Sequence, residues 1–312
     1  MKRVIGVSLA LLMVLSAIAL ADGVGAFSAF KSGVGARALA MGGAFVAVAD
    51  DATAVLWNPA GLAQVADTRI SGMTTDLYGL GITHQYVGAV TTFANLGIGL
   101  SWERAALGGQ EAAEDGTTGG AFTWNESLIL GTLATNIMDI ALAGVSLKYY
   151  MADSGLGDSA SGIGFDLGVL VNLGSMFVLG VNAADLGGTK VSWSGGATDI
   201  VSGLYKAGMA MKLVDGKLVL AADMDFVGTD LGDAHLGIEF KVVDALALRA
   251  GVVLTDAFQN YHFGVGAGIN VAGLYVDAAY ILEGTLGNTL ILSAEFSLGD
   301  LLGGSEPTVG VE

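Results

Sequence analysis

The stretch Lys217-Leu218-Val219-Leu220-Ala221-Ala222-Asp223-Met224-Asp225-Phe226 decides how this chain folds. Its even-numbered residues are all apolar, whereas its odd-numbered residues include one lysine and two aspartates. Successive side chains of a β-strand point to opposite faces, so this stretch has one apolar face and one partly charged face. The same period of two recurs at 162–173, 234–243, 261–272 and 289–299. The chain is therefore expected to be rich in strands with one apolar face each.

The composition places these strands in a membrane. Hydrophobic residues make up 53% of the 312 residues, 49 residues are glycine, and only 14% are charged, against roughly 25% in soluble domains. A net charge of −17 argues against nucleic-acid partners, because these require a basic surface. After Ala21 no apolar run approaches the ~20 residues of a spanning helix. A closed β-barrel is the other structure that satisfies its backbone in lipid.

Alternation extends over most of the chain and predicts an all-β, transmembrane antiparallel barrel of about fourteen strands at 67–299. An apolar outer face with a polar inner face is typical of such barrels, and their strand number is even in bacteria. The alternative is a soluble β-sandwich, which would carry more surface charge. Longer loops are expected at 106–122 and 187–204, with both chain ends and a tail at 300–312 in the periplasm. The expected strands are 68–77, 83–93, 96–105, 123–136, 140–153, 162–173, 177–186, 205–214, 217–227, 234–243, 246–255, 261–272, 274–284 and 289–299.

The first segment has the pattern of a signal peptide. Lys2 and Arg3 precede an apolar run, and Ala19-Leu20-Ala21 offers the small residues that signal peptidase recognises. We expect cleavage after residue 21, with an uncleaved anchor as the alternative. Together with the barrel, this predicts an integral protein of a bacterial outer membrane. Its expected partners are outer-membrane lipid, lipopolysaccharide and, during insertion, the barrel-assembly machinery.

Residues 22–66 do not alternate and contain small-residue turns. Asp50 or Asp51 can cap a short helix that runs through Trp57. Asn58 suits a second helix cap, because Pro59 would then occupy the first helical position, where a missing N–H costs nothing. This segment is therefore expected to form two short helices before the barrel begins.

Two blocks in this segment resemble the FadL superfamily of outer-membrane barrels, and within it the PorV/PorQ-like group. They are Gly35-Ala36-Arg37-Ala38-Leu39-Ala40-Met41-Gly42-Gly43-Ala44-Phe45-Val46-Ala47-Val48-Ala49-Asp50-Asp51-Ala52 and Trp57-Asn58-Pro59-Ala60-Gly61-Leu62-Ala63. The resemblance implies that residues 22–66 fold into the barrel as a plug, or hatch. The plug or gate residues that it suggests are Asp50, Asp51, Trp57, Asn58, Pro59, Ala60 and Gly61.

The resemblance implies two alternative functions. In the FadL branch the plug gates passive passage of hydrophobic compounds, and Asn58, Pro59 and Ala60 match its Asn-Pro-Ala stretch. In the PorV branch the barrel is a shuttle or scaffold that receives proteins exported by a type IX-like secretion system. The expected partner is accordingly a hydrophobic small molecule or a secreted protein.

The inward faces carry charges of both signs, which predicts cross-strand ion pairs, with a selective constriction as the alternative. Asp223 and Asp225 share one face, and we expect them to pair with Lys212, Lys217 or Lys241 rather than to bind a cation. The three histidines lie far apart in sequence, cysteine is absent, and no catalytic motif stands out. We therefore expect neither an enzyme nor a cofactor. The lumen residues are Lys212, Lys217, Asp223, Asp225, Glu239, Arg249, Asp277 and Glu295.

Overall fold

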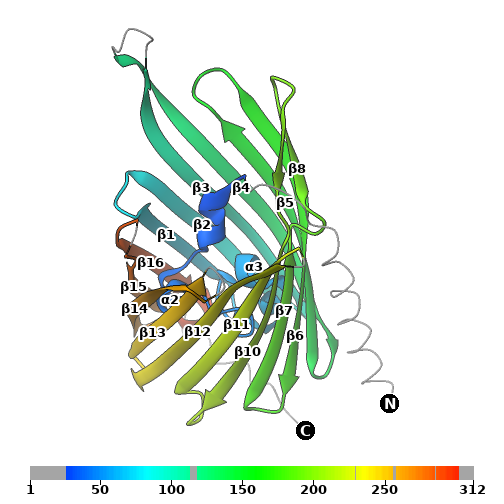
Figure 1. Ribbon diagram of the computed structural model, residues 1–312. Helices are drawn as coiled ribbons and strands as arrows, with labels where there is room; N and C mark the ends of the chain where they lie inside the picture. Colours follow the sequence, from blue (N-terminus) through cyan, green and yellow to red (C-terminus); the bar gives the residue numbers. More distant parts are fainter. Residues whose placement is uncertain (1–25, 113–117, 229, 256–257, 285, 302–312) are drawn as a thin grey trace.

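A computed structural model describes residues 26–112, 118–228, 230–255, 258–284 and 286–301 (Figure 1). The predicted signal peptide at 1–21 lies outside the described residues, as does the tail from 302 onward. No helix in the described ranges is long and apolar enough to cross a bilayer.

Within these ranges, fourteen strands form a closed antiparallel barrel, which confirms the predicted fold class. Each of the fourteen expected segments overlaps one of them. The barrel closes where the first strand pairs with the last, with Arg69 opposite Ser297 and Thr75 opposite Ile291. The strands are β1 Arg69–Leu77, β2 Ile82–Phe93, β3 Leu96–Ala112, β4 Thr118–Met138, β5 Ala141–Asp153, β6 Ser159–Leu173, β7 Phe177–Ala184, β10 Leu204–Leu213, β11 Leu218–Val227, β12 Asp230–Val243, β13 Leu246–Thr255, β14 Asn260–Val271, β15 Leu274–Leu282 and β16 Thr289–Ser297.

Two expected loops contain strands instead. β3 runs up to residue 112 and β4 begins at residue 118, so both strands extend into the range 106–122. The range 187–204 holds a hairpin of β8 Thr189–Trp193 and β9 Thr198–Val201, and β8 pairs with β6. In both ranges the backbone hydrogen bonds between strands continue where the apolar alternation of side chains has ended. The alternation therefore did not reveal these parts of the strands.

The two faces of the wall differ as the alternation predicted. On β16, for example, Leu290, Leu292 and Phe296 are exposed, whereas Ile291 and Glu295 are buried. Exposed large apolar side chains continue around the barrel on the other strands. Such an exterior suits the acyl chains of a bilayer.

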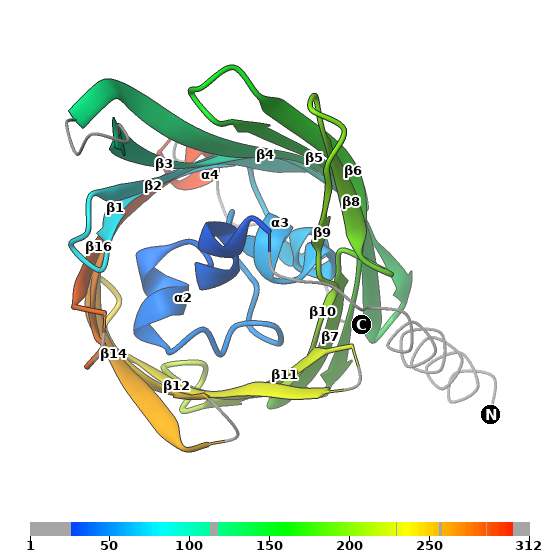
Figure 2. The ribbon, with the colours of Figure 1, turned by 45° about the horizontal axis from the view of Figure 1, so that its top comes forward.

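The N-terminal segment lies inside the barrel (Figure 2). Its helices are η2 Ser28–Ser32, α2 Ala36–Ala40, α3 Ala54–Trp57 and η3 Pro59–Gln64, and α4 Leu298–Leu301 follows the last strand. We call residues 26–66 the interior segment. Its apolar side chains form one core with inward residues of the wall, which include Leu170 and Ile291. The hydrophobic core of this protein is thus the contact between segment and wall.

Glycines in the wall allow this close contact. A Cβ atom at Gly144 of β5 would lie 2.3 Å from the carbonyl carbon of Pro59, and one at Gly251 of β13 would lie 2.1 Å from that of Met41. No side chain fits at either position unless the segment moves. The wall is therefore shaped to the backbone of the interior segment on opposite sides of the lumen.

Candidate functional site

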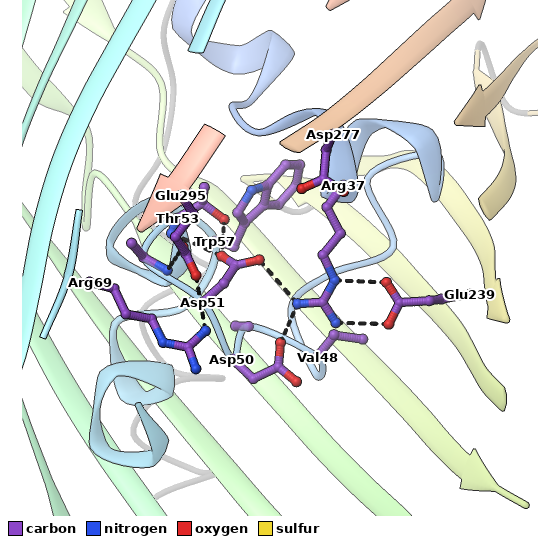
Figure 3. Close-up of polar contacts among 12 residues, drawn as sticks. Arg37, Val48, Asp50, Asp51, Thr53, Trp57, Arg69, Glu239, Asp277 and Glu295 are labelled. Carbon is purple, nitrogen blue, oxygen red and sulfur yellow. Dashed lines mark hydrogen bonds and ion pairs between the residues drawn. The ribbon is translucent and has the colours of Figure 1, made fainter. Parts of the chain in front are cut away.

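Arg37 ties the interior segment to the wall. Its guanidinium group donates two hydrogen bonds to the carboxylate of Glu239 on β12, from Nε at 2.8 Å and from Nη2 at 3.0 Å. Nη1 donates to Asp50 at 2.5 Å and to Asp51 at 3.1 Å (Figure 3). The side chain of Glu239 is only 1% exposed. Such charge-assisted pairs, made in a buried place, are among the stronger polar contacts in proteins.

Further ion pairs of the wall flank this contact. Arg249 on β13 donates to Glu239 at 2.6 Å and to Asp277 of β15 at 2.5 Å. Glu295 on β16 accepts from the backbone N–H of Ala52 at 2.8 Å and from Arg69 at 2.9 Å. We call this group the Arg37 cluster. Its members are Arg37, Asp50, Asp51, Arg69, Glu239, Arg249, Asp277 and Glu295.

Burial of Asp50 by itself would raise the pKa of its carboxyl group. The adjacent Arg37 guanidinium, helped by the charge of Lys212, outweighs burial and holds the pKa of Asp50 below its ordinary value. Asp50 is therefore the charged partner of Arg37 at neutral pH. Asp51 has a second task, because its Oδ1 accepts from the N–H of Thr53 at 2.9 Å and so fixes the turn before α3.

The two aspartates of β11 do not have the predicted partners. Asp223 accepts from the backbone N–H groups of Phe45 and Val46, at 2.7 and 2.8 Å. Asp225 pairs with Lys206 at 2.7 Å and lies 3.2 Å from Nε2 of His235. The expected pairing with Lys212, Lys217 or Lys241 is therefore wrong. The sequence could not show that backbone N–H groups of the interior segment would reach this face.

Lys212 and Lys217 do not join the Arg37 cluster. Neither makes an ion pair within the described part of the chain, although the charge of Lys212 acts on Asp50. Lys217 lies in the turn before β11 and is exposed. Of the other predicted lumen charges, Asp225 contacts Lys206 and His235, and the rest contact the interior segment or each other.

The predicted gate residues form the second point of attachment. Asn58 is fully buried and caps η3, where its Oδ1 accepts from the N–H of Ala60 at 3.2 Å, as predicted. Its Nδ2 donates to the carbonyl oxygens of Val46 at 2.9 Å and Val169 at 3.2 Å. The latter belongs to β6, so this one side chain joins two parts of the segment to the wall. Pro59, Ala60 and Gly61 are buried beside it.

Trp57, the last residue of α3, is buried and joins two parts of the interior segment. Its indole N–H donates to the carbonyl oxygen of Val34 at 2.9 Å, and its ring packs edge-on against Phe45 with centroids 5.9 Å apart. This contact holds the beginning of the segment against its middle.

Two cavities lie on either side of the segment. The rim cavity, of about 360 Å³, is lined by apolar side chains such as Leu39, Val253 and Ile291 together with polar and charged ones, and reaches the strand ends at Leu77 and Thr255. The cluster cavity, of about 230 Å³, is lined by the Arg37 cluster together with Met73 and Tyr86. Gly33 lines the rim cavity and Gly35 lines the cluster cavity, so only a short part of the segment separates the two.

The rim cavity also contains a feature that the sequence did not predict. All three histidines, His84, His235 and His262, line it, although 178 positions separate the first from the last. Within the described ranges, no group of three or more histidine and carboxylate side chains is placed to bind a metal ion. The histidines therefore add to the charged side chains Lys31, Lys206, Asp225, Asp233 and Glu283 that also line this cavity.

Sequence reasoning missed Arg37, Arg69 and His235 as members of the site. One signal was present, because Arg37 is the only charged residue between Lys31 and Asp50. A lone charge in a run of small apolar residues suggests a specific buried partner. Its partner Glu239 lies 202 positions away, so the pair could not be identified from the sequence.

The site and the fold together define a class of protein, a fourteen-strand barrel whose lumen holds its own N-terminal segment. Several solved structures are similar. TodX, a toluene transporter of Pseudomonas putida, gives a TM-score of 0.65 at 15% identity over 86% of this chain and 99% of TodX. The Ralstonia pickettii toluene transporter TbuX gives 0.62 at 13% identity over 85% and 98%. A FadL homologue of Pseudomonas aeruginosa gives 0.57 at 14% identity over 84% and 97%.

At these identities the likeness concerns the fold. The shared barrel fold is the one that the predicted resemblance to the FadL superfamily implied, and these structures give no support to the PorV/PorQ-like group. No protein-family model and no curated protein matches the sequence.

Proposed function

We propose that this protein is a FadL-like barrel of a bacterial outer membrane, which admits small hydrophobic compounds by passive transport. The single observation that carries the proposal is the arrangement inside the lumen. A folded segment separates the partly apolar rim cavity from the cluster cavity, which is lined mainly by charged side chains, and the same segment is held by a few polar contacts. The similar fold of two toluene transporters supports this reading.

In this proposal the interior segment is the gate. Contacts around Asn58, Gly144 and Gly251 hold its main body firmly against the wall. Its first residues are held more weakly, because Gly35 donates its N–H to the sulfur of Met73 and Ala36 to the hydroxyl of Ser293. Gly35 lines the cluster cavity and Gly33, two residues before it, lines the rim cavity, so a small displacement here would join the two. Transport of this kind needs no cofactor.

A disulfide across this border tests the proposal. Ala36→Cys with Ser293→Cys replaces two residues whose backbone nitrogen and hydroxyl oxygen lie 3.1 Å apart. The chain has no other cysteine, so the new pair is the only one that can form. The readout is uptake of N-phenyl-1-naphthylamine or toluene by a host bacterium whose outer membrane excludes them.

The expected result has three parts. The wild-type chain raises uptake above that of the host alone, the oxidised double variant lowers it, and a reducing agent restores it. Each single cysteine variant is the matched control and should behave like the wild type. Uptake equal to that of the host alone would contradict the transport function, and full uptake through the oxidised variant would contradict the gate.

A further inference from the structure

The rim of the barrel is strongly uneven. The strands β1, β15 and β16 have nine residues each, close to the ~9–11 with which a tilted strand crosses the hydrocarbon. Leu107 of β3 pairs with Ile82, the first residue of β2, and β3 continues for five residues beyond Leu107. At about 3.3 Å per residue this adds roughly 17 Å along the strand. Figure 1 shows the β3–β4 hairpin rising far above the turn between β1 and β2.

The low part of the rim exposes large apolar side chains. Leu80 in the β1–β2 turn is 56% exposed, Leu231 at the start of β12 is 50%, Phe258 before β14 is 47%, and Leu286 before β16 is 49%. The strands concerned follow one another around the wall in the order β2, β1, β16, β15, β14, β13, β12 and β11. We call these four residues the apolar arc.

The apolar arc continues the exterior of the barrel. Directly below it on the outer face lie exposed residues such as Leu282 and Leu290. Strands that only just span the hydrocarbon place their loops at the level of the lipid headgroups and not in the water beyond. Exposed apolar side chains at that level are favoured by contact with the acyl chains, whereas in water each would cost free energy.

The rim cavity reaches the strand ends next to the loops that carry this arc. Its lining includes Leu77 and Tyr78 beside the β1–β2 turn, Thr255 at the end of β13, and Glu283 just after β15. The loops that carry the apolar arc are thus the border between the surrounding lipid and this cavity. On the side of β3 to β6, the tall β3–β4 and β5–β6 hairpins rise above the rest of the rim (Figure 1).

We propose that the apolar arc is a membrane-embedded port, through which a hydrophobic compound enters the rim cavity from the lipid leaflet and not from water. The ligand class is a small hydrophobic molecule already dissolved in the bilayer, where the hydrophobic effect concentrates it. The occupant of the arc itself is lipid, because the arc is continuous with the apolar exterior. This inference rests on the proposed transport function and adds the direction of entry.

Fluorescence quenching tests the position of the arc. Because the chain is free of cysteine, single variants Leu80→Cys, Phe258→Cys and Leu286→Cys can each carry one environment-sensitive fluorophore. Leu156→Cys is the matched control, since Leu156 is 57% exposed at the tip of the β5–β6 loop. The labelled proteins are placed in phosphatidylcholine vesicles that contain a nitroxide-labelled lipid.

The arc labels should be quenched by the lipid nitroxide and protected from iodide in the water, and the label at 156 should show the reverse. Iodide quenching of all four labels alike would overturn the proposal. So would arc labels that avoid the nitroxide but cross-link to a second copy, which would make the arc a contact between copies. Neither result depends on transport, so this experiment stands even where the proposed function fails.

Uptake by cells tests the route. The double variant Leu80→Asp with Leu286→Asp places charge on the arc, and Leu156→Asp is the control on the tall side. The double variant should take up N-phenyl-1-naphthylamine several-fold more slowly than the wild type, and the control should match the wild type. Wild-type uptake through the double variant would refute the port and leave the transport function intact. Absence of uptake through the wild type would refute the transport function itself.

Discussion

Replacing Arg37 by methionine should loosen the interior segment and leave the barrel closed. Methionine fills a similar apolar volume but makes none of the four hydrogen bonds to Glu239, Asp50 and Asp51. Breaking a buried ion pair costs about 3–5 kcal/mol. Glu239 keeps Arg249 as a partner, and the Arg37 side chain is 19% exposed, so we expect the lower end, about 3 kcal/mol.

A loss of this size corresponds to about a hundredfold higher population of the undocked segment. Hydrogen exchange followed by mass spectrometry measures it directly, because amide protection reports the free energy of local opening. In detergent, the amides of residues 33–58 should exchange about a hundredfold faster in R37M than in the wild type. The amides of β3 to β6 should be unchanged, because their ladders do not involve Arg37.

The matched control is Lys217→Met, which removes one cation from an exposed turn. It should leave the exchange of the interior segment as it is. Equal protection of residues 33–58 in R37M and the wild type would refute the reasoning that Arg37 holds the segment. Faster exchange throughout the barrel would show instead that Arg37 supports the wall.

Three further results are expected. Because the pKa of Asp50 is lowered in the folded state, its contribution is complete above its ordinary value of 3.8 and is lost as the pH falls through the lowered pKa. The wild type should therefore lose more thermal stability than Asp50→Asn between about pH 6 and about pH 3, and equal losses would contradict this. Gly144→Ala should lower the free energy of unfolding by about 1–3 kcal/mol through overpacking, because the new Cβ would meet the Pro59 backbone at 2.3 Å. Gly131→Ala in β4 is its control, since nothing lies within 4 Å there, and a similar loss in both would count against a fitted wall. Asn58→Ala leaves the carbonyl oxygens of Val46 and Val169 without this donor, and should cost about 1–3 kcal/mol in urea unfolding; an unchanged midpoint would exclude Asn58 as an attachment.

The alternation of side chains alone was sufficient to predict the barrel. All fourteen predicted segments correspond to strands, because the period of two is a local property of the extended backbone and each strand must separate lipid from lumen. The cap at Asn58 was predictable for the same reason, since a capping residue and the proline after it act within a few positions. The upper parts of β3 and β4 were missed because outside the bilayer no apolar face is required.

Only the tertiary structure decided how the lumen is organised. The interior segment has no period, so nothing in the sequence showed that Arg37 would meet Glu239 or that Asp223 would accept from the backbone of Phe45. These contacts depend on the register of strands far apart in the chain and on closure of β1 against β16. The same closure brings the three histidines to one cavity and sets four exposed apolar residues side by side on the low rim. The sequence determines which way each side chain faces, because that choice is local, and the closed barrel determines what it meets.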